Sequence, residues 1–389
     1  MKQAYLDNSA TTPVDSRVAE AMQPFLKESF GNPSSVHSTG QTVRVAVEHA
    51  RSQVAALIGA RDDEIFFTSG GTEADNWAIK GAAWARSDKG NHIITSSIEH
   101  HAVIESCEYL AKHGFEVTFL PVDRYGKVAP GDVEKAITPK TILISIMHAN
   151  NEIGTIQPVA EIGRIARQHG ILFHVDAVQT TGHLPVNVGD LNADLLSMSG
   201  HKLYGPKGIG ALYIKKGVRI DSLLSGGSQE RHKRPGTENV PGIVGFGKAA
   251  EIAMAEMNDE TEKITALRDR LAAELLERIP DATLNGHPSE RLPNNVNISF
   301  QYVEGESLVL HLDFEAISAS TGSACSSSSL EPSHVLLACG RLAEEAHGSI
   351  RFSLGKFNDD EDIDRVIETL PGIVKKLRAM SPLAPGAVK

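Results

Sequence analysis

The chain has few cysteines and no long hydrophobic run. Its three cysteines are an odd number at wide spacing among 389 residues, which argues against both a disulfide framework and a closed zinc site. Any cysteine that matters is expected to act as a thiol. No apolar segment is long enough to cross a bilayer, and the N-terminus lacks a charged start followed by an apolar run. We therefore expect a cytoplasmic protein.

The chain also has fewer basic than acidic residues. Lys and Arg number 38 against 49 Asp and Glu, which gives a formal net charge of −11. This balance argues against a general nucleic-acid-binding surface and against attachment to an anionic membrane. Small molecules or less acidic proteins are the expected partners. The length predicts two or three domains with a large buried core.

Short apolar runs alternate with amphipathic helical segments through the first 215 residues. The expected strands are Glu64–Phe67, His92–Ile94, Val117–Leu120, Ile142–Met147, Ile171–Val175, Asp194–Met198 and Ile209–Ile214. The expected helices are Val43–Ile58, Thr72–Arg86, Ala102–His113 and Val159–His169. This alternation predicts an α/β fold with a mostly parallel sheet and helices on both faces. Ligands of such folds bind outside the carboxyl ends of the strands.

The pattern changes after residue 240. A helical pattern covers residues 240–279, and the charged segment Asn258–Lys263 predicts a boundary between two helices there. Beyond it, short strands and helices alternate as in a smaller α+β domain. The expected domains are a large one over residues 16–260 and a small one made of residues 1–15 and 261–389.

Lys202 lies in the segment SGHKLYGPKGIG, residues 199–210, directly after an apolar strand. Neighbouring Ser and His side chains can bind an anion, and the glycines let the backbone approach one closely. A lysine in this position is a candidate Schiff-base nucleophile, and pyridoxal phosphate (PLP) is the carbonyl cofactor that uses one. A solvated lysine beside a Gly-Pro turn explains this segment alone equally well.

Two other strand ends could serve that cofactor. The strand at 64–67 leads into TSGGTE, where Gly71 and Thr72 begin a helix whose N-terminal N–H groups could bind phosphate. Asp176 ends a buried strand, where a carboxylate needs a cationic partner such as a protonated pyridine nitrogen. A capped turn explains the first motif, and a helix-capping aspartate the second, equally well.

Further polar residues follow strand ends. His100 could lie over the cofactor ring and move protons, since the unperturbed pKa of histidine is near neutral. Asn151 could hydrogen-bond the phenolic oxygen of the cofactor or a carboxylate, or could form an ordinary asparagine turn. Gln179 lies on the same side of the chain as Asp176 if a helix begins there.

Cys325 lies in a Ser- and Gly-rich segment, Ser318–Ser329, without bulky side chains. We expect this segment to be mobile and its thiol to be a candidate nucleophile, although such segments usually carry no chemistry. Cys107 and Cys339 lie in apolar helical patterns and are expected to be buried. Arg351 lies inside a strand pattern and needs an anionic partner, either a substrate carboxylate or an acidic side chain.

Ten ordered motifs resemble the PLP-dependent cysteine desulfurases of the class V aminotransferase group (NifS/IscS type). They run nearly end to end: YLDNSATTP at 5–13, GNPSSVH at 31–37, TSGGTEADN at 68–76, EHHAV at 99–103, ANNEIG at 149–154, HVDAVQ at 174–179, SGHKLYGPKGIG at 199–210, RPGTENV at 234–240, GSACSSSSLEPSH at 322–334 and IRFSLGKF at 350–357. Because they occur together and in order, the resemblance is far more specific than any single motif.

The resemblance implies fold type I of the PLP-dependent transferases, with a seven-stranded sheet and a smaller α+β domain. Lys202 would hold the cofactor, Asp176 would pair with its ring nitrogen and His100 would stack on its ring. The implied phosphate ligands are Gly71, Thr72, Ser199 and His201, together with Thr237 from the other subunit of a homodimer. The implied ligands of the phenolic oxygen are Gln179 and Asn151, and those of the substrate are Arg351 and Asn151.

The implied activity removes sulfur from L-cysteine and releases L-alanine. Cys325 would take the sulfur as a persulfide and donate it to an iron–sulfur scaffold protein, and through that persulfide it could contact iron transiently. The phrase LEPSHVL looks most like the nitrogen-fixation branch, so nitrogenase and general cluster assembly both stay open. The alternatives are a selenocysteine lyase or another amino-acid lyase on this fold, and a non-catalytic sulfur-binding scaffold.

Overall fold

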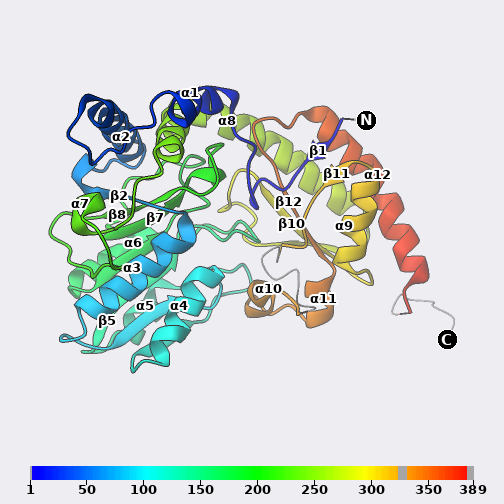
Figure 1. Ribbon diagram of the computed structural model, residues 1–389. Coiled ribbons are helices and arrows are strands. Elements are labelled where there is room, and N and C mark those ends of the chain that lie inside the picture. The colour runs from blue at the N-terminus through cyan, green and yellow to red at the C-terminus, as the bar shows by residue number, and fades with distance from the viewer. Residues whose placement is uncertain (1, 323–330, 383–389) are drawn as a thin grey trace.

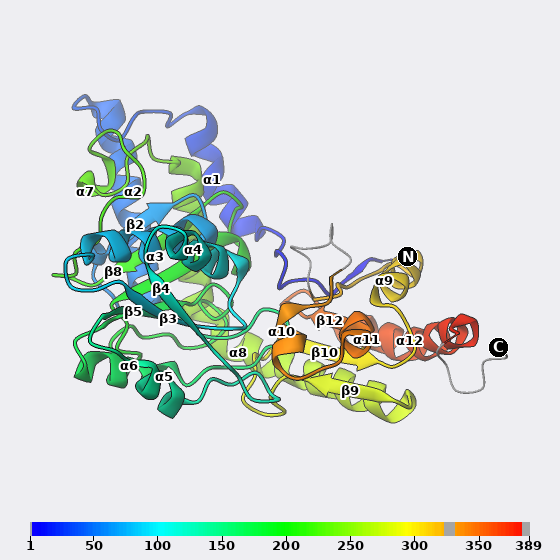
Figure 2. The ribbon, with the colours of Figure 1, turned by 90° about the horizontal axis from the view of Figure 1, so that it is seen from below.

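A large and a small sheet lie at opposite ends of one long helix, α8 (Val240–Arg278), in the computed structural model (Figure 1). The structure describes residues 2–322 and 331–382. Figure 2 shows the same two bodies from below, with α8 passing from one to the other. No helix among the described residues is long and apolar enough to cross a membrane.

The large sheet has seven strands in the order β2-β8-β7-β6-β5-β3-β4. Its strands are β2 (Ile65–Thr68), β3 (His92–Ser96), β4 (Glu116–Leu120), β5 (Thr141–Met147), β6 (Leu172–Asp176), β7 (Leu195–Ser199) and β8 (Gly210–Ile214). In this sheet β8 runs in the direction opposite to the other six strands. The predicted α/β class and mostly parallel seven-stranded sheet are therefore confirmed, and each predicted strand lies within two residues of the observed one.

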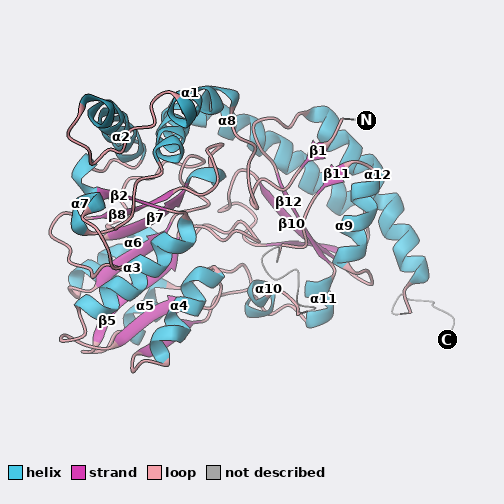
Figure 3. Ribbon diagram, in the orientation of Figure 1, coloured by secondary structure: helices cyan, strands magenta, loops and turns pink. Residues whose placement is uncertain are grey.

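Helices cover both faces of this sheet (Figure 3). Side chains alternate across a strand, so Phe66 and Leu195 belong to one apolar core while Phe67 and Leu196 belong to another. The first core is closed by α3 (Gly71–Ala85) and α4 (His101–Ala111). The second is closed by α1 (Ser16–Lys27), α2 (Ser38–Leu57), α5 (Pro130–Ala136), α6 (Val159–Gln168) and the first half of α8.

The predicted helix boundary at Asn258–Lys263 is wrong, because α8 is continuous over 39 residues. One end of the helix packs on the large core as far as Ile252, and its other end packs on the small core from Ile264. The charged stretch spans the interval between the cores, where half-buried and exposed positions alternate and no apolar face is required. Its Glu and Lys residues favour helix, so the helix continues without burial.

The small body packs helices on an antiparallel sheet with the order β12-β10-β9. Its elements are β9 (Ala282–Asn285), β10 (Asn295–Phe300), α9 (Gly305–Phe314), α10 (His334–Ala338), α11 (Ala343–His347), β12 (Ser349–Ser353) and α12 (Asp360–Met380). The N-terminal strand β1 (Ala4–Tyr5) pairs with β11 (Ile317–Ser318), so Ala4 and Leu6 enter this core. The domain boundary at residue 260 falls inside α8 and stays a prediction.

Candidate active site

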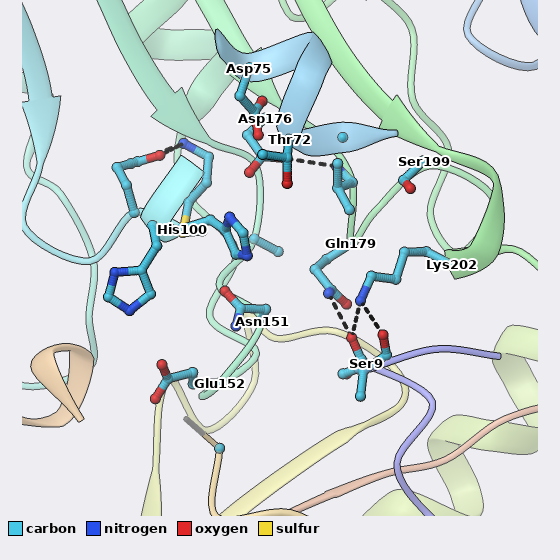
Figure 4. Close-up of a pocket in the computed structure, with 18 of the residues that line it drawn as sticks. Ser9, Thr72, Asp75, His100, Asn151, Glu152, Asp176, Gln179, Ser199 and Lys202 are labelled. Atoms are coloured by element: carbon cyan, nitrogen blue, oxygen red, sulfur yellow. Dashed lines mark hydrogen bonds between the residues drawn. The ribbon is translucent and has the colours of Figure 1, made fainter. Parts of the chain in front are cut away.

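A cavity of about 400 Å³ opens at the carboxyl ends of β5, β6 and β7 (Figure 4). It is where an α/β sheet is expected to bind its ligand. The structure brings ten of the twelve predicted site residues to its wall: Gly71, Thr72, His100, Asn151, Asp176, Gln179, Ser199, His201, Lys202 and Arg351. Thr237 lines a different cavity, of about 160 Å³, beside Thr68 and Ser69. Cys325 lies outside the described residues.

Lys202 ends a short 3₁₀ turn, Gly200–Lys202, that follows β7. Its Nζ donates to the carbonyl oxygen of Ser9 and, at 2.8 Å, to that of Ala10. The lysine backbone is fixed as well, because its carbonyl oxygen lies 2.7 Å from Nε2 of His183. An N-terminal segment thus holds the lysine amine at the cavity wall, as Figure 4 shows.

Asp176 is the last residue of β6, next to β7 in the sheet, so the parallel strands bring it and Lys202 to the same edge. Its Oδ1 accepts from Val178 N at 3.0 Å. Burial raises the pKa of Asp176 to about 6, although the Val178 N–H and the charge of Lys202 favour the carboxylate. Asp176 therefore ends a strand and also accepts a hydrogen bond within the turn that follows it. A turn and not a helix follows Asp176, so the helix considered for Gln179 is not formed, although Gln179 and Asp176 line the same cavity.

Asp75, on α3, lines the cavity beside Asp176 (Figure 4). Burial and the Asp176 charge raise the pKa of Asp75 well above its usual value. Its Oδ1 is 3.6 Å from Nε2 of His174, a buried ring that also contacts Ser145 and Ser197 at 2.8 and 3.0 Å. Burial lowers the pKa of His174 to about 3, so the ring is neutral.

The N-terminus of α3 faces the cavity through Gly71 and Thr72. Its N-cap residue is Gly70, which has no side chain to bond the first-turn N–H groups. A Cβ atom on Gly71 would lie 2.8 Å from Cγ2 of Val178, so any larger residue would require the Val178 side chain in the turn after β6 to move. This helix end is suited to bind an anion such as phosphate. Ser199 lines the cavity beside this helix end, with its Cβ 3.6 Å from where a Cβ on Gly71 would lie.

His201 adds a neutral ring to the cavity wall. Its Nδ1 lies 3.1 Å from Oγ1 of Thr11, and its carbonyl accepts from Oγ1 of Thr12 at 3.0 Å. Burial, helped by the charges of Lys202 and Lys207, lowers the pKa of His201 to about 4. The ring therefore lines the cavity as a hydrogen-bonding group without charge.

His100 is the N-cap of α4, and His101 begins the helix, one residue before the predicted start at Ala102. The Nδ1 atom of His100 accepts from Ala102 N at 3.1 Å. Burial lowers the pKa of His100 to about 4, with the charge of Lys202 contributing. Because Nδ1 accepts a hydrogen bond, the neutral ring carries its proton on Nε2.

Glu99, next to His100, is fully buried. Its carboxyl accepts from Ser96 Oγ at 2.5 Å and from Met147 N at 2.9 Å. Burial nevertheless raises the pKa of Glu99 to about 8. His334, at the start of α10, lies 3.1 Å from the Glu99 carbonyl oxygen through Nε2, and so connects α10 to this wall.

Arg351 reaches the cavity from β12 of the small body. Its Nη2 lies 2.9 Å from Oδ1 of Asp7, and its Nη1 donates to the carbonyl oxygens of Asn151 at 3.0 Å and Gly322 at 3.2 Å. The acidic partner considered for this strand arginine is therefore present. Its buried Nε makes no hydrogen bond to any described residue.

Sequence reasoning missed several members of the site. The carbonyls of Ser9 and Ala10 lie inside the quoted motif YLDNSATTP, but a backbone oxygen leaves no mark on residue type. Asp75 and Glu99 also lie inside quoted motifs, TSGGTEADN and EHHAV. A carboxylate at a predicted buried position was the signal that could have identified both. Burial of Cys107 and Cys339 is confirmed.

The family model described as aminotransferase class V matches residues 4–366. The chain belongs to the class V aminotransferase family. A relative of this class V aminotransferase, named cysteine desulfurase IscS, from Methanosarcina thermophila, is 62% identical over 384 residues, which cover 99% of this chain and 95% of the relative. The predicted membership of this group is thereby confirmed.

Solved structures also resemble the class V aminotransferase chain over most of its length. A NifS-like protein superposes with a TM-score of 0.91 at 41% identity, covering 96% of this chain and 100% of the other. A structure titled SspA in complex with cysteine has a TM-score of 0.82 at 39% identity, covering 92% and 100%. The fold type I assignment is thus confirmed.

PLP is the cofactor of this family, and the cavity of this class V aminotransferase fits it. The cavity wall has an amine at Lys202 and a buried carboxylate at Asp176, which needs a cationic partner. The end of α3 near Gly71 supplies N–H groups for an anion. These are the groups that an aldehyde, a pyridinium nitrogen and a phosphate require.

Proposed function

We propose that the chain is a PLP-dependent cysteine desulfurase, which converts L-cysteine to L-alanine and transfers the sulfur to Cys325. The observation that carries this proposal is the shared cavity of Lys202 and Asp176 at the ends of two adjacent strands. The names of the relatives support the reaction: a cysteine desulfurase at 62% identity, and a related structure described in complex with cysteine.

Each side chain of the cavity has a role in this proposal. Lys202 holds the cofactor and moves the substrate α-proton, and Asp176 keeps the ring nitrogen protonated. PLP, when bound, supplies an electron sink for negative charge that develops on the substrate. His100 covers the ring, and its neutral imidazole exchanges a proton with the substrate.

The remaining polar groups orient the cofactor and the substrate. The phosphate ligands are Gly71, Thr72, Ser199 and His201, with Thr237 supplied by a second copy in a homodimer. Gln179 and Asn151 bind the phenolic oxygen, and Asn151 also meets the substrate. Arg351 binds the substrate carboxylate, and its Nε and fixed guanidinium plane support that role.

Sulfur transfer completes the proposal. The Cys325 thiolate attacks the substrate sulfur, so that an S–S bond forms as the Cβ–S bond breaks. The electron pair of the broken bond stays on the carbon skeleton, which takes up protons and leaves as L-alanine. The persulfide then passes to an iron–sulfur scaffold protein, in the cytoplasm, for general cluster assembly or nitrogenase.

The purified protein tests the proposal directly. We expect visible absorbance of lysine-bound cofactor that borohydride removes, and equal amounts of alanine and cysteine-derived sulfur from L-cysteine. Preference for selenocysteine over cysteine would favour the lyase alternative. A protein without this absorbance and without alanine formation would be the non-catalytic scaffold, and the proposal would be wrong.

A further inference from the structure

Residues 230–232 form a strained segment on the surface of the large body. Glu230, Arg231 and His232 have φ angles of 46°, 57° and 65°, so three successive residues with side chains adopt the left-handed region. L-residues seldom do so, and such conformations persist only where surrounding contacts hold them. The segment lies beside β2 in Figure 1, where it forms the short helix α7 (Gln229–His232).

A buried ion pair fastens this segment to the edge of the sheet. Both Glu230 oxygens meet Arg51 of α2, at 2.8 and 2.9 Å, and the two side chains are only 3% and 4% exposed. The same groups complete the open edge of β2: Glu230 accepts from Phe67 N at 3.0 Å, and Arg51 donates to Ile65 O at 2.9 Å. The pair therefore takes the place of a neighbouring strand.

A second ion pair lies on the other side of the turn that follows β2. Arg234 contacts Glu73, in the first turn of α3, through two hydrogen bonds of 2.8 and 3.0 Å. Glu73 in turn accepts from Ser69 N at 2.8 Å. Residues 68–72, which contain the phosphate-binding helix end, are thus held at Phe67 before the turn and at Glu73 after it. One surface segment makes both attachments.

We propose that Arg51–Glu230 and Arg234–Glu73 are positioning pairs that fix the turn 68–72 in the shape that binds the cofactor phosphate. This inference rests on the proposed function, because it assigns the phosphate to that turn. Bidentate, charge-assisted pairs set both distance and direction, which single hydrogen bonds from solvent would not. The left-handed backbone at Glu230 is what brings its carboxylate to β2 while Arg234 reaches α3.

The phosphate of the cofactor gives a selective test. Glu230→Gln and Arg234→Gln are compared with wild type for binding of PLP and of pyridoxal, which lacks the phosphate, by absorbance titration of cofactor-free protein. We expect the PLP dissociation constant to rise at least tenfold and that of pyridoxal to change less than twofold. Inorganic phosphate should compete with pyridoxal phosphate less well in both variants than in wild type.

Glu64→Gln is the matched control. Glu64 is equally buried, lies just before β2 and also bonds backbone N–H groups, of Arg61 at 3.0 Å and Lys216 at 2.8 Å, but at the far end of the strand. It should bind both compounds as wild type does. Equal losses for PLP and pyridoxal in the two test variants, or unchanged PLP binding, would overturn the proposal.

The experiment also distinguishes a variant that does not fold, and a failure of the proposed function, from a failure of this proposal. If the buried Glu230→Gln protein does not fold, Arg234→Gln carries the test, because the Arg234 side chain is 22% exposed. If wild type binds no PLP, the proposed function has failed, and that outcome is distinct from selective failure of the variants. Both outcomes are measured by cofactor binding alone, without an assay of enzyme activity.

Discussion

Asp7 and Arg351 form an ion pair across 344 residues of sequence, with Oδ1 2.9 Å from Nη2. The arginine side chain is 2% exposed, and its second terminal nitrogen is held by the carbonyls of Asn151 and Gly322. The guanidinium plane is therefore fixed before any substrate arrives. A substrate carboxylate would meet an arginine that has little side-chain entropy left to lose.

Arg351→Lys should raise the KM for L-cysteine about 10- to 100-fold, because an ammonium group cannot replace a planar bidentate donor. Loss of one charge-assisted hydrogen bond costs about 1.5–3 kcal/mol of binding free energy, which corresponds to this change. The cofactor absorbance should be retained. Steady-state kinetics of the variant measures this. Asp7→Asn keeps the guanidinium and should change KM less than Arg351→Lys does; an unchanged KM in Arg351→Lys would remove the carboxylate role.

His100→Asn should separate the ring of His100 from its capping role. Asparagine is a good N-cap, so α4 and the free energy of unfolding should change by less than about 1 kcal/mol. Turnover should fall about 10²- to 10⁴-fold if the ring transfers a proton. His37→Asn is the matched control, since His37 caps α2 through Gly40 N and does not line the cavity. Equal turnover in both variants would contradict the role.

Much of the site could be predicted because parallel strands bring their carboxyl ends together. Asp176 and Lys202 follow adjacent strands, so their motifs alone placed them at one edge. The partners of Lys202 could not be predicted, since backbone carbonyls supply them. Continuity of α8 was missed because a charged stretch between two cores has the same composition as a loop between helices.

Lys202→Ala and Cys325→Ala should fail in different ways. Without the amine, the protein should lose the visible absorbance of lysine-bound cofactor together with alanine formation. Without the thiol, the absorbance should stay, while persulfide on the protein, measured by mass spectrometry, should disappear. Wild-type turnover in Lys202→Ala would refute the anchor role, and wild-type sulfur transfer in Cys325→Ala would refute the nucleophile.

Glu99→Gln should flatten the pH dependence of stability. The pKa of Glu99 is raised from its ordinary value of 4.5 to about 8 in the folded chain. The stability it contributes is therefore complete below pH 4.5 and is lost as pH rises toward 8. The free energy of unfolding of wild type should fall relative to the variant by about 1.4 kcal/mol per pH unit across that window.

Denaturant unfolding between pH 4.5 and 8 tests this. Glu161→Gln, at an exposed position on α6, is the control and should keep the pH dependence of wild type. A Glu99→Gln protein whose stability follows wild type at every pH would show that Glu99 is already a carboxylate at pH 5.

Asp75 and Asp176 are neighbouring buried acids, and substitution by asparagine should have a small effect at Asp75 and a large one at Asp176. Burial and the Asp176 charge raise the pKa of Asp75 well above its usual value, which favours its protonated form. Asp75→Asn replaces it with a neutral group of the same shape, so PLP affinity should change less than threefold. Asp176→Asn removes the carboxylate that pairs with the ring nitrogen, and turnover should fall at least 100-fold. Absorbance titration measures PLP affinity, and alanine assays measure turnover. A tenfold loss of PLP affinity in Asp75→Asn would contradict this prediction. It would mean that Asp75 is charged and that the pyridinium nitrogen meets two carboxylates instead of one.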